Sequence, residues 1–148
     1  MPGCPFPNSR RPTSSIPAVP AHWTFPSHPA SVRKARHAVA EALPSTCLPE
    51  LALDLGLLVS ELVTNAIRYG TRPTDDDPIE LVLWVADSHY WLAVSDSGLT
   101  LPALATPGPD ACGGRGLLLV DAVSTTWAVV PRRTCGKSVV AGIRVPGA

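Results

Sequence analysis

One stretch decides the fold: Glu61-Leu62-Val63-Thr64-Asn65-Ala66-Ile67. Its apolar residues continue a stripe at helical spacing that begins at Leu51, so they predict a long amphipathic helix that stops at Gly70. Within this helix Glu61 and Asn65 are four residues apart, which puts their side chains one turn apart on the same side. The sequence therefore predicts a helix on which two polar side chains lie next to each other on one side.

That pair of side chains suits phosphate chemistry with a metal. An amide oxygen such as that of Asn65 can help to hold Mg²⁺, which prefers oxygen ligands and keeps some of its waters. The Glu61 carboxylate could accept a proton from a nucleophile that approaches a metal-bound phosphate. The simpler alternative, which the pair alone favours, is that both residues lie at the solvent edge of an amphipathic helix.

The elements around this helix indicate the fold class. A helix over residues 29–43 precedes it, and a hairpin follows, with strands over residues 79–86 and 90–95 around Asp87-Ser88-His89. We also expect an edge strand at 22–25, a loop at 101–113, a helix from Arg115 or Gly116 to Val123, and strands at 125–130 and 138–145. This order predicts an α+β fold, a two-layer α/β sandwich with helices on one face of a mostly antiparallel mixed sheet.

A second polar motif, Asp96-Ser97-Gly98, stands at the end of the hairpin. Gly98 lets the backbone turn there or lets a ligand come close. A fixed carboxylate at Asp96 would select adenine, because adenine has an exocyclic amino donor where guanine has an acceptor. Taken alone, such a motif is more often just a turn.

A third motif, Gly113-Gly114-Arg115-Gly116, leads into an apolar helical run. Unhindered amides at a helix N-terminus favour an anion such as phosphate, although a glycine-rich helix start can also be a tight connection without a ligand. Gly136-Lys137-Ser138 looks like the end of a P-loop, but Pro131 stands where that loop needs a glycine. A P-loop is therefore excluded.

The composition excludes other classes of protein. Lys plus Arg and Asp plus Glu both total 12, so bulk electrostatics gives no reason to expect nucleic-acid binding. The four cysteines are far apart and form no metal-binding spacing. Without a signal peptide or a membrane-length apolar run, we expect a soluble, cytoplasmic protein with no membrane partner.

We expect residues 1–20 to be a disordered Pro-rich tail, or less readily a docking segment, before one domain at 21–146.

Together and in this order, the three motifs resemble the Bergerat ATP-binding fold of gyrase, mismatch-repair ATPases, heat-shock chaperones and histidine kinases. With Leu117 and the late Gly136-Lys137-Ser138, they are more narrowly similar to the bacterial anti-sigma factor serine/threonine kinases and their small actinobacterial relatives. The likeness covers about residues 23–145, including the start of the first helix. Histidine kinases fit less well, because the segment around His37 lacks their phosphoacceptor motif, and we expect His37 to be a surface residue.

The resemblance implies a role for each motif. In that family the residue matching Asn65 ligates Mg²⁺, the one matching Glu61 is the catalytic base, and the one matching Asp96 holds the adenine amino group. The likeness thus implies ATP and Mg²⁺ as cofactors, with the glycine-rich turn against the phosphates. The nucleotide-binding residues that it implies are Asn65, Asp96, Gly98, Gly114, Arg115, Gly116, Leu117 and Ser138.

Two positions depart from the family's pattern. Thr100 stands where the motif Asp-x-Gly-x-Gly has its last glycine, so a Cβ there could crowd the nucleotide or stiffen the lid. Ala111-Cys112 replaces an acidic residue that often precedes the glycine-rich turn. These departures bear on nucleotide affinity and on lid motion rather than on the fold.

Two functions of different classes are compatible with these residues. The first is a serine/threonine kinase that phosphorylates an anti-anti-sigma-type partner and switches between that partner and a sigma factor; the likeness also implies a homodimer. The second is a non-catalytic module that binds ATP in order to grip a partner, which the Thr100 departure keeps open. A third, ATP hydrolysis without a protein acceptor, would need water at Glu61.

Overall fold

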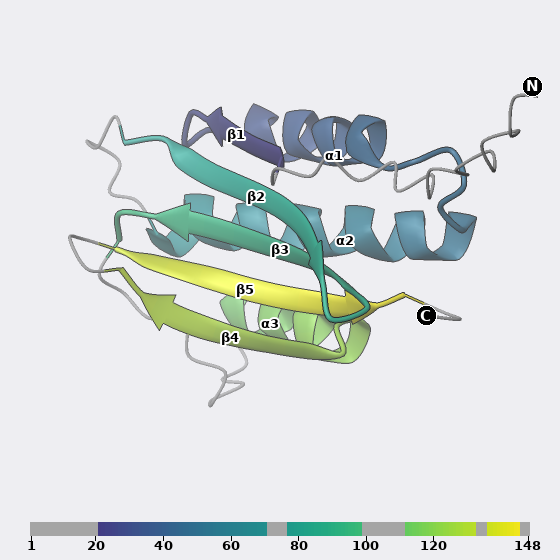
Figure 1. Cartoon of the computed structure of the whole chain (residues 1–148). Helices are drawn as coiled ribbons and strands as arrows, with labels where there is room; N and C mark the ends of the chain where they lie inside the picture. The colour runs from purple at the N-terminus through teal and green to yellow at the C-terminus, as the bar shows by residue number, and fades with distance from the viewer. Residues whose placement is uncertain (1–20, 71–76, 99–111, 133–135, 146–148) are drawn as a thin grey trace, which may run out of the picture.

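The computed structural model of the chain describes residues 21–70, 77–98, 112–132 and 136–145. Within these ranges five strands form one sheet, and the helices lie together on one face of it (Figure 1). The elements in chain order are β1 (Ala21–Phe25), α1 (Ala30–Ala42), α2 (Pro49–Asn65), the π-helical turn η1 (Ala66–Gly70), β2 (Ile79–Ala86), β3 (His89–Asp96), α3 (Cys112–Val123), β4 (Thr126–Pro131) and β5 (Lys137–Arg144). The predicted two-layer α+β fold is confirmed. The predicted tail, residue Thr100 and most of the predicted loop at 101–113 lie outside the described residues.

The strand order of the sheet is β1-β2-β3-β5-β4. We expected a mixed sheet, but each neighbouring pair of described strands is antiparallel. The reason is the place of β5. The strands β3 and β4, which α3 connects, run in the same direction, but β5 lies between them and pairs antiparallel with both. The expected edge strand is confirmed as β1, which pairs with β2.

The β2–β3 hairpin turns on two residues, Asp87 and Ser88, whose φ angles are 52° and 60°. Two consecutive left-handed residues are typical of the tight type I′ turn, which matches the twist of the flanking strands. We expected a three-residue connection, but His89 already belongs to β3 and pairs with Ala86. The tight turn fixes the register, so Glu80 lies opposite Ser95 near the other end of the hairpin.

The core fills the space between the sheet and the helices. Alternate side chains of each inner strand face the helix layer, as in β5, where Val139, Ala141 and Ile143 are buried. In Figure 1, α2 lies between α1 and α3 behind the sheet, and it packs against both. The largest fully buried side chains are Leu55, Leu58, Leu62, Ile79, Leu81, Leu92, Val39, Val59, Val63, Val94 and Val120.

The helix α2, which contains Glu61 and Asn65, begins as the sequence predicts but ends in a way that the sequence did not predict. Pro49 occupies the first turn of α2, where its missing N–H costs no hydrogen bond. The α-helical part ends at Asn65, and the turn from Ala66 to Gly70 is π-helical. Turns of this kind occur often at functional sites, because an extra residue shifts the side chains that follow.

The third helix begins earlier than we predicted. It starts at Cys112 rather than at Arg115 or Gly116, so the glycine-rich motif forms its first turn instead of preceding it. Helix propensity places glycines outside helices, but here α3 packs on α2, and this tertiary contact outweighs the propensity. None of the described helices combines the length and the apolar character that crossing a membrane requires.

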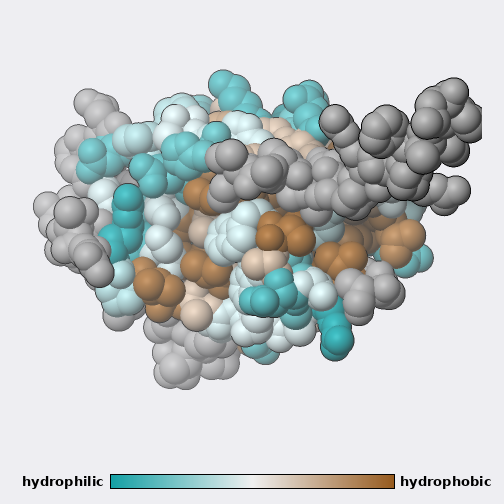
Figure 2. Space-filling model, in the orientation of Figure 1, coloured by the Kyte–Doolittle hydropathy of each residue, from teal (hydrophilic) through white to brown (hydrophobic). Residues whose placement is uncertain are grey.

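The other face of the sheet carries no described helix. Figure 2, which views this face, shows apolar residues (brown) among polar ones (teal). Trp84 and Trp91 stack there, with ring centroids 6.2 Å apart. Of the three aromatic residues of the hairpin strands, Trp84, Tyr90 and Trp91, only Tyr90 faces the helices and is buried. Strand alternation is the reason, since Trp84 and Trp91 are opposite each other and one residue out of phase with Tyr90.

Candidate functional site

The first part of the site is the end of α2. Asn65 is 7% exposed, and its Nδ2 has no hydrogen-bond partner among the described residues. A buried polar atom without a partner is uncommon in folded proteins and points to a missing ligand, water or ion. The nitrogen and oxygen of an amide exchange places on a flip, so the same position can present an oxygen acceptor. Asn65 is thus a buried polar group with a free contact.

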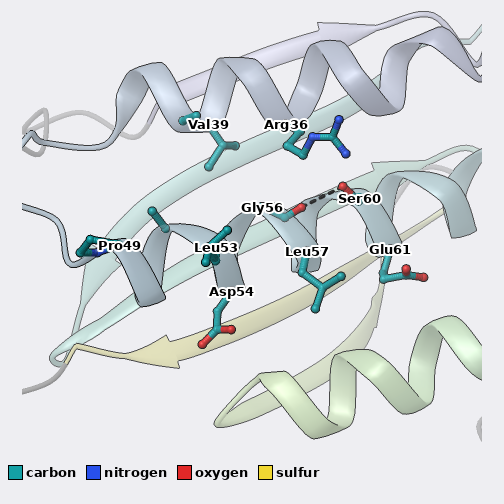
Figure 3. Close-up of a pocket in the computed structure, with 11 residues that line it drawn as sticks. Arg36, Val39, Pro49, Leu53, Asp54, Gly56, Leu57, Ser60 and Glu61 are labelled. Atoms are coloured by element: carbon teal, nitrogen blue, oxygen red, sulfur yellow. Dashed lines mark hydrogen bonds between the residues drawn. The ribbon is translucent and has the colours of Figure 1, made fainter.

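Glu61 lies one turn before Asn65 and is half-buried. It also lines a groove of about 1020 Å³ between α1 and α2. Figure 3 shows Glu61 at the far end of the labelled part of α2, beyond Ser60. This carboxylate is thus partly exposed to solvent, whereas its neighbour Asn65 is buried, so the two residues do not both lie at the solvent edge of the helix.

The groove itself was not predicted. Its lining includes Leu53, which is 74% exposed, and Leu57, four residues later on α2. Arg36 of α1 reaches over the surface of α2, where the Cγ atom would lie 3.7 Å from a Cβ placed on Gly56 (Figure 3). The signal in the sequence was a pair of leucines off the core stripe. Such a mixed apolar and charged groove is suited to contact with another protein.

The second part of the site is Asp96, at the end of β3. Its side chain is 2% exposed, and its Oδ1 accepts hydrogen bonds from the Gly98 amide at 2.9 Å and from the Lys137 ammonium at 3.0 Å. The Asp96-Ser97-Gly98 motif therefore forms a turn, and its Asp96 carboxylate is also a buried hydrogen-bond acceptor. Lys137, whose side chain is 4% exposed, was missed by the sequence reasoning. The signal for it was alternation, which puts Lys137 on the buried face of β5 with Val139 and Ala141.

Burial sets the charge behaviour of Asp96. Loss of solvent raises the pKa of its carboxyl above the ordinary value. The hydrogen bond and charge of Lys137, the Gly98 amide and the charge of Arg132 lower the pKa, but they do not outweigh burial. Lys137, whose ammonium lies 3.0 Å from Asp96 Oδ1, is the main group that opposes the effect of burial and favours the ionised form of this carboxylate.

The start of β5 depends on Gly136. This residue has a φ of +87°, and a Cβ on it would lie 1.8 Å from the Asp96 carbonyl oxygen. Only glycine fits such a close backbone contact in this conformation. The contact brings β5 alongside β3 so that Lys137 pairs with Asp96.

The structure corrects the expectation for Ser138. We placed Ser138 in the nucleotide site, but its hydroxyl lies 2.6 Å from that of Ser95, on the sheet face without helices. Successive residues of a strand point to opposite faces, so Lys137 and not Ser138 directs its side chain to Asp96. The family likeness located the segment, and the strand parity decides which of its side chains faces the site.

The third part of the site is the start of α3. The backbone of Gly114, Arg115, Gly116 and Leu117 lies in the first turns of this helix. The first four amides of a helix, here those from Cys112 to Arg115, have no acceptor within the helix, so they could bind an anion even though the glycines lie inside the helix. The phosphate-binding prediction therefore keeps a physical basis, with its position moved into the helix.

These groups fit ATP and Mg²⁺ by their chemistry. Asp96 offers a buried acceptor for a base amino group, Asn65 offers a buried amide with a free contact, and α3 offers amides to phosphate. In the described ranges, no three His, Cys, Asp or Glu side chains gather to hold a metal. Mg²⁺ is commonly bound by one or two protein groups together with waters and substrate phosphates, which agrees with this donor set.

Comparison with known proteins gives a family and a fold. The sequence model of the family described as the histidine kinase-like ATPase domain matches residues 25–141. No curated protein matches the chain. Among solved structures, the chain is similar to the crystal structure of the RsbU and RsbW domains of Rv1364c from Mycobacterium tuberculosis, with a TM-score of 0.66 and 20% identity. The match covers 86% of this chain and 33% of the other, so the chain spans about a third of that protein's length.

Proposed function

Because the chain belongs to the histidine kinase-like ATPase domain family, we propose that it is an ATP-dependent serine/threonine kinase of the anti-sigma factor type. Its acceptor would be a hydroxyl of an anti-anti-sigma-like protein, and a sigma factor would be its second client. The solved structure that joins RsbW with RsbU in one protein is consistent with a partner-switching role. The single observation that carries this proposal is the buried Asn65 amide, unpartnered among the described residues and one helical turn after Glu61.

The base of the nucleotide would be read by Asp96. This carboxylate is buried and fixed by two donors, so it presents an acceptor in a defined position. An adenine amino group satisfies such an acceptor, whereas the guanine carbonyl would face it with a second acceptor. This chemistry supports ATP over GTP.

The phosphates and the metal would lie between α2 and α3, which pack together. Bound ATP supplies the transferable phosphoryl group, and bound Mg²⁺ neutralises its charge. The Asn65 side chain is the metal ligand that we propose on this chain, and the amides at the start of α3 would hold phosphate oxygens. Because α2 packs on α3, the two helices could present these groups to the same nucleotide.

Glu61 would accept the proton of the partner's hydroxyl. It is half-buried and lines the groove between α1 and α2, so a protein docked in the groove could bring a serine or threonine to it. A carboxylate in hydrogen-bond reach of such a hydroxyl orients it and takes its proton as the phosphoryl group transfers.

The test is phosphoryl transfer by Glu61→Ala, with Glu50→Ala as a matched control because Glu50 is exposed in the first turn of the same helix. We expect Glu61→Ala to lower transfer from labelled ATP to an anti-anti-sigma protein by about 10²-fold or more while it leaves ATP affinity unchanged. The control should phosphorylate at the wild-type rate. Full transfer by Glu61→Ala would remove this residue from the mechanism.

One observation favours a second function, a non-catalytic module that grips a partner when ATP is bound. The exposed leucines Leu53 and Leu57 give the groove an apolar surface that phosphoryl transfer alone does not require. Mass spectrometry of the partner after incubation with ATP distinguishes the two functions. A partner that binds in the presence of ATP and stays unphosphorylated would favour the module.

A further inference from the structure

Lys137 is a buried cation, and it is the only one among the described residues. Its Nζ lies 3.0 Å from Asp96 Oδ1, on the side of the sheet that faces the helices. We propose that Lys137 sets the purine preference of the nucleotide site by holding Asp96 in its charged form, which only accepts hydrogen bonds. The inference rests on the proposed function, because it takes Asp96 as the residue that reads the base.

The backbone fixes this pair, so it does not depend on one side-chain rotamer. Asp96 and Lys137 are opposite each other in the register of β3 and β5. Gly136 lets the two backbones approach just before this pair, at a distance that any Cβ would prevent. Both hydrogen bonds described for the carboxylate fall on Oδ1, so Oδ2 is the oxygen that would accept the amino group of a base.

Among the charged groups near Asp96, Lys137 has the largest part in lowering the pKa of its carboxyl. On the sheet side, Arg132 follows β4 and acts from further away, and its guanidinium is paired with Glu80 at 3.3 Å. On the helix side, α2 carries Glu61 and the following turn carries Arg68, and neither is among the groups that shift the pKa of Asp96. Without Lys137, burial would be opposed only by the Gly98 amide and by Arg132.

The consequence is a change in what the site can recognise. An ionised carboxylate offers acceptors only, whereas a protonated carboxyl also offers one O–H donor. A protonated Asp96 could donate to the carbonyl of hypoxanthine or guanine, so it would no longer reject these bases. Loss of Lys137 should raise the pKa of Asp96 further and admit the protonated form as the pH falls. Lys137 thus acts through Asp96 as a positioning residue.

The test is the affinity of ATP and of inosine triphosphate, measured by calorimetry with Mg²⁺ between about pH 8 and about pH 6. The variants are Lys137→Met and, as a matched control, Lys34→Met, which removes an exposed lysine of α1. We expect the wild type and the control to prefer ATP by about 10²-fold or more over this range. The preference of Lys137→Met should shrink by at least about tenfold between the higher and the lower pH.

A second variant keeps the proposal testable if the single substitution unfolds the chain. Asp96→Asn with Lys137→Met leaves a neutral pair, and an Asn amide can both donate and accept. We expect this double variant to fold, to bind both nucleotides within about threefold of each other, and to show no pH dependence. A lasting ATP preference of Lys137→Met at the lower pH would overturn the role of Lys137 and leave the proposed function intact. A lasting ATP preference of the double variant would show that Asp96 does not select the base, and it would overturn the inference together with the proposed role of Asp96. Failure of the wild type to bind ATP would overturn both.

Discussion

Two ion pairs lie at the same end of the sheet and differ in burial. Asp96 and Lys137 join β3 to β5 with side chains 2% and 4% exposed, at 3.0 Å. Glu80 and Arg132 join β2 to the end of β4, with both side chains 36% exposed, at 3.3 Å. The two ion pairs thus have similar lengths, but we expect them to differ in their effect on stability. The exposed charges remain solvated and depend little on each other, whereas each buried charge needs its partner.

The largest effect should follow from breaking the buried pair. We expect Lys137→Met to lower the free energy of unfolding by about 3–5 kcal/mol, because it leaves the buried Asp96 carboxylate without its main partner. The double variant Asp96→Asn with Lys137→Met should recover most of this loss, since it buries no charge. Urea denaturation measures both. Equal stability of the single and the double variant would show that the two side chains are not coupled.

A smaller loss should follow from moving the backbone that carries the buried pair. Gly136→Ala puts a Cβ against the Asp96 carbonyl at a left-handed φ, so we expect it to cost about 2 kcal/mol or more. Gly56→Ala is the matched control, because its nearest neighbour is at 3.7 Å in a helix interior, and it should stabilise the chain by up to about 1 kcal/mol. Thermal unfolding followed by circular dichroism compares the two. If both substitutions changed the free energy of unfolding in the same direction, this would argue against the close contact at Gly136.

The smallest effect should follow from breaking the exposed pair. We expect Arg132→Gln to change the free energy of unfolding by less than about 1 kcal/mol, because both partners are partly solvated. The change should shrink further at high salt, which screens exposed charges. Urea denaturation at low and high ionic strength checks this. A loss as large as that of Lys137→Met would remove the distinction between the two pairs.

The elements that could be predicted from the sequence are those with a strong period. The apolar stripe locates the start of α2, and the alternation of β2 and β3 locates both strands, to within a residue or two. The π-helical turn after Asn65 could not be predicted, because no local pattern distinguishes it from the last turn of an α-helix. The start of α3 was misplaced because glycine propensity argued against a helix that tertiary packing nonetheless forms.

The positions of the candidate site residues could be predicted in part, while their roles remain proposals. Motif spacing located Glu61, Asn65 and Asp96, and the burial of the last two agrees with a binding role. The motif likeness could not decide which side chain of the β5 segment faces Asp96, because that depends on strand parity. Counting the alternation back from Ile143 would have put Lys137 on the inner face and Ser138 on the outer one. A charged residue in phase with an apolar strand face is therefore the signal that was overlooked.

The most direct test of a nucleotide site that selects adenine through Asp96 is a calorimetric titration of the wild-type chain with ATP and with GTP, each with and without Mg²⁺. We expect ATP to bind, Mg²⁺ to strengthen its binding, and GTP to bind at least about tenfold more weakly because its carbonyl would face the Asp96 acceptor. Equal binding of GTP, or ATP binding that ignores Mg²⁺, would contradict it.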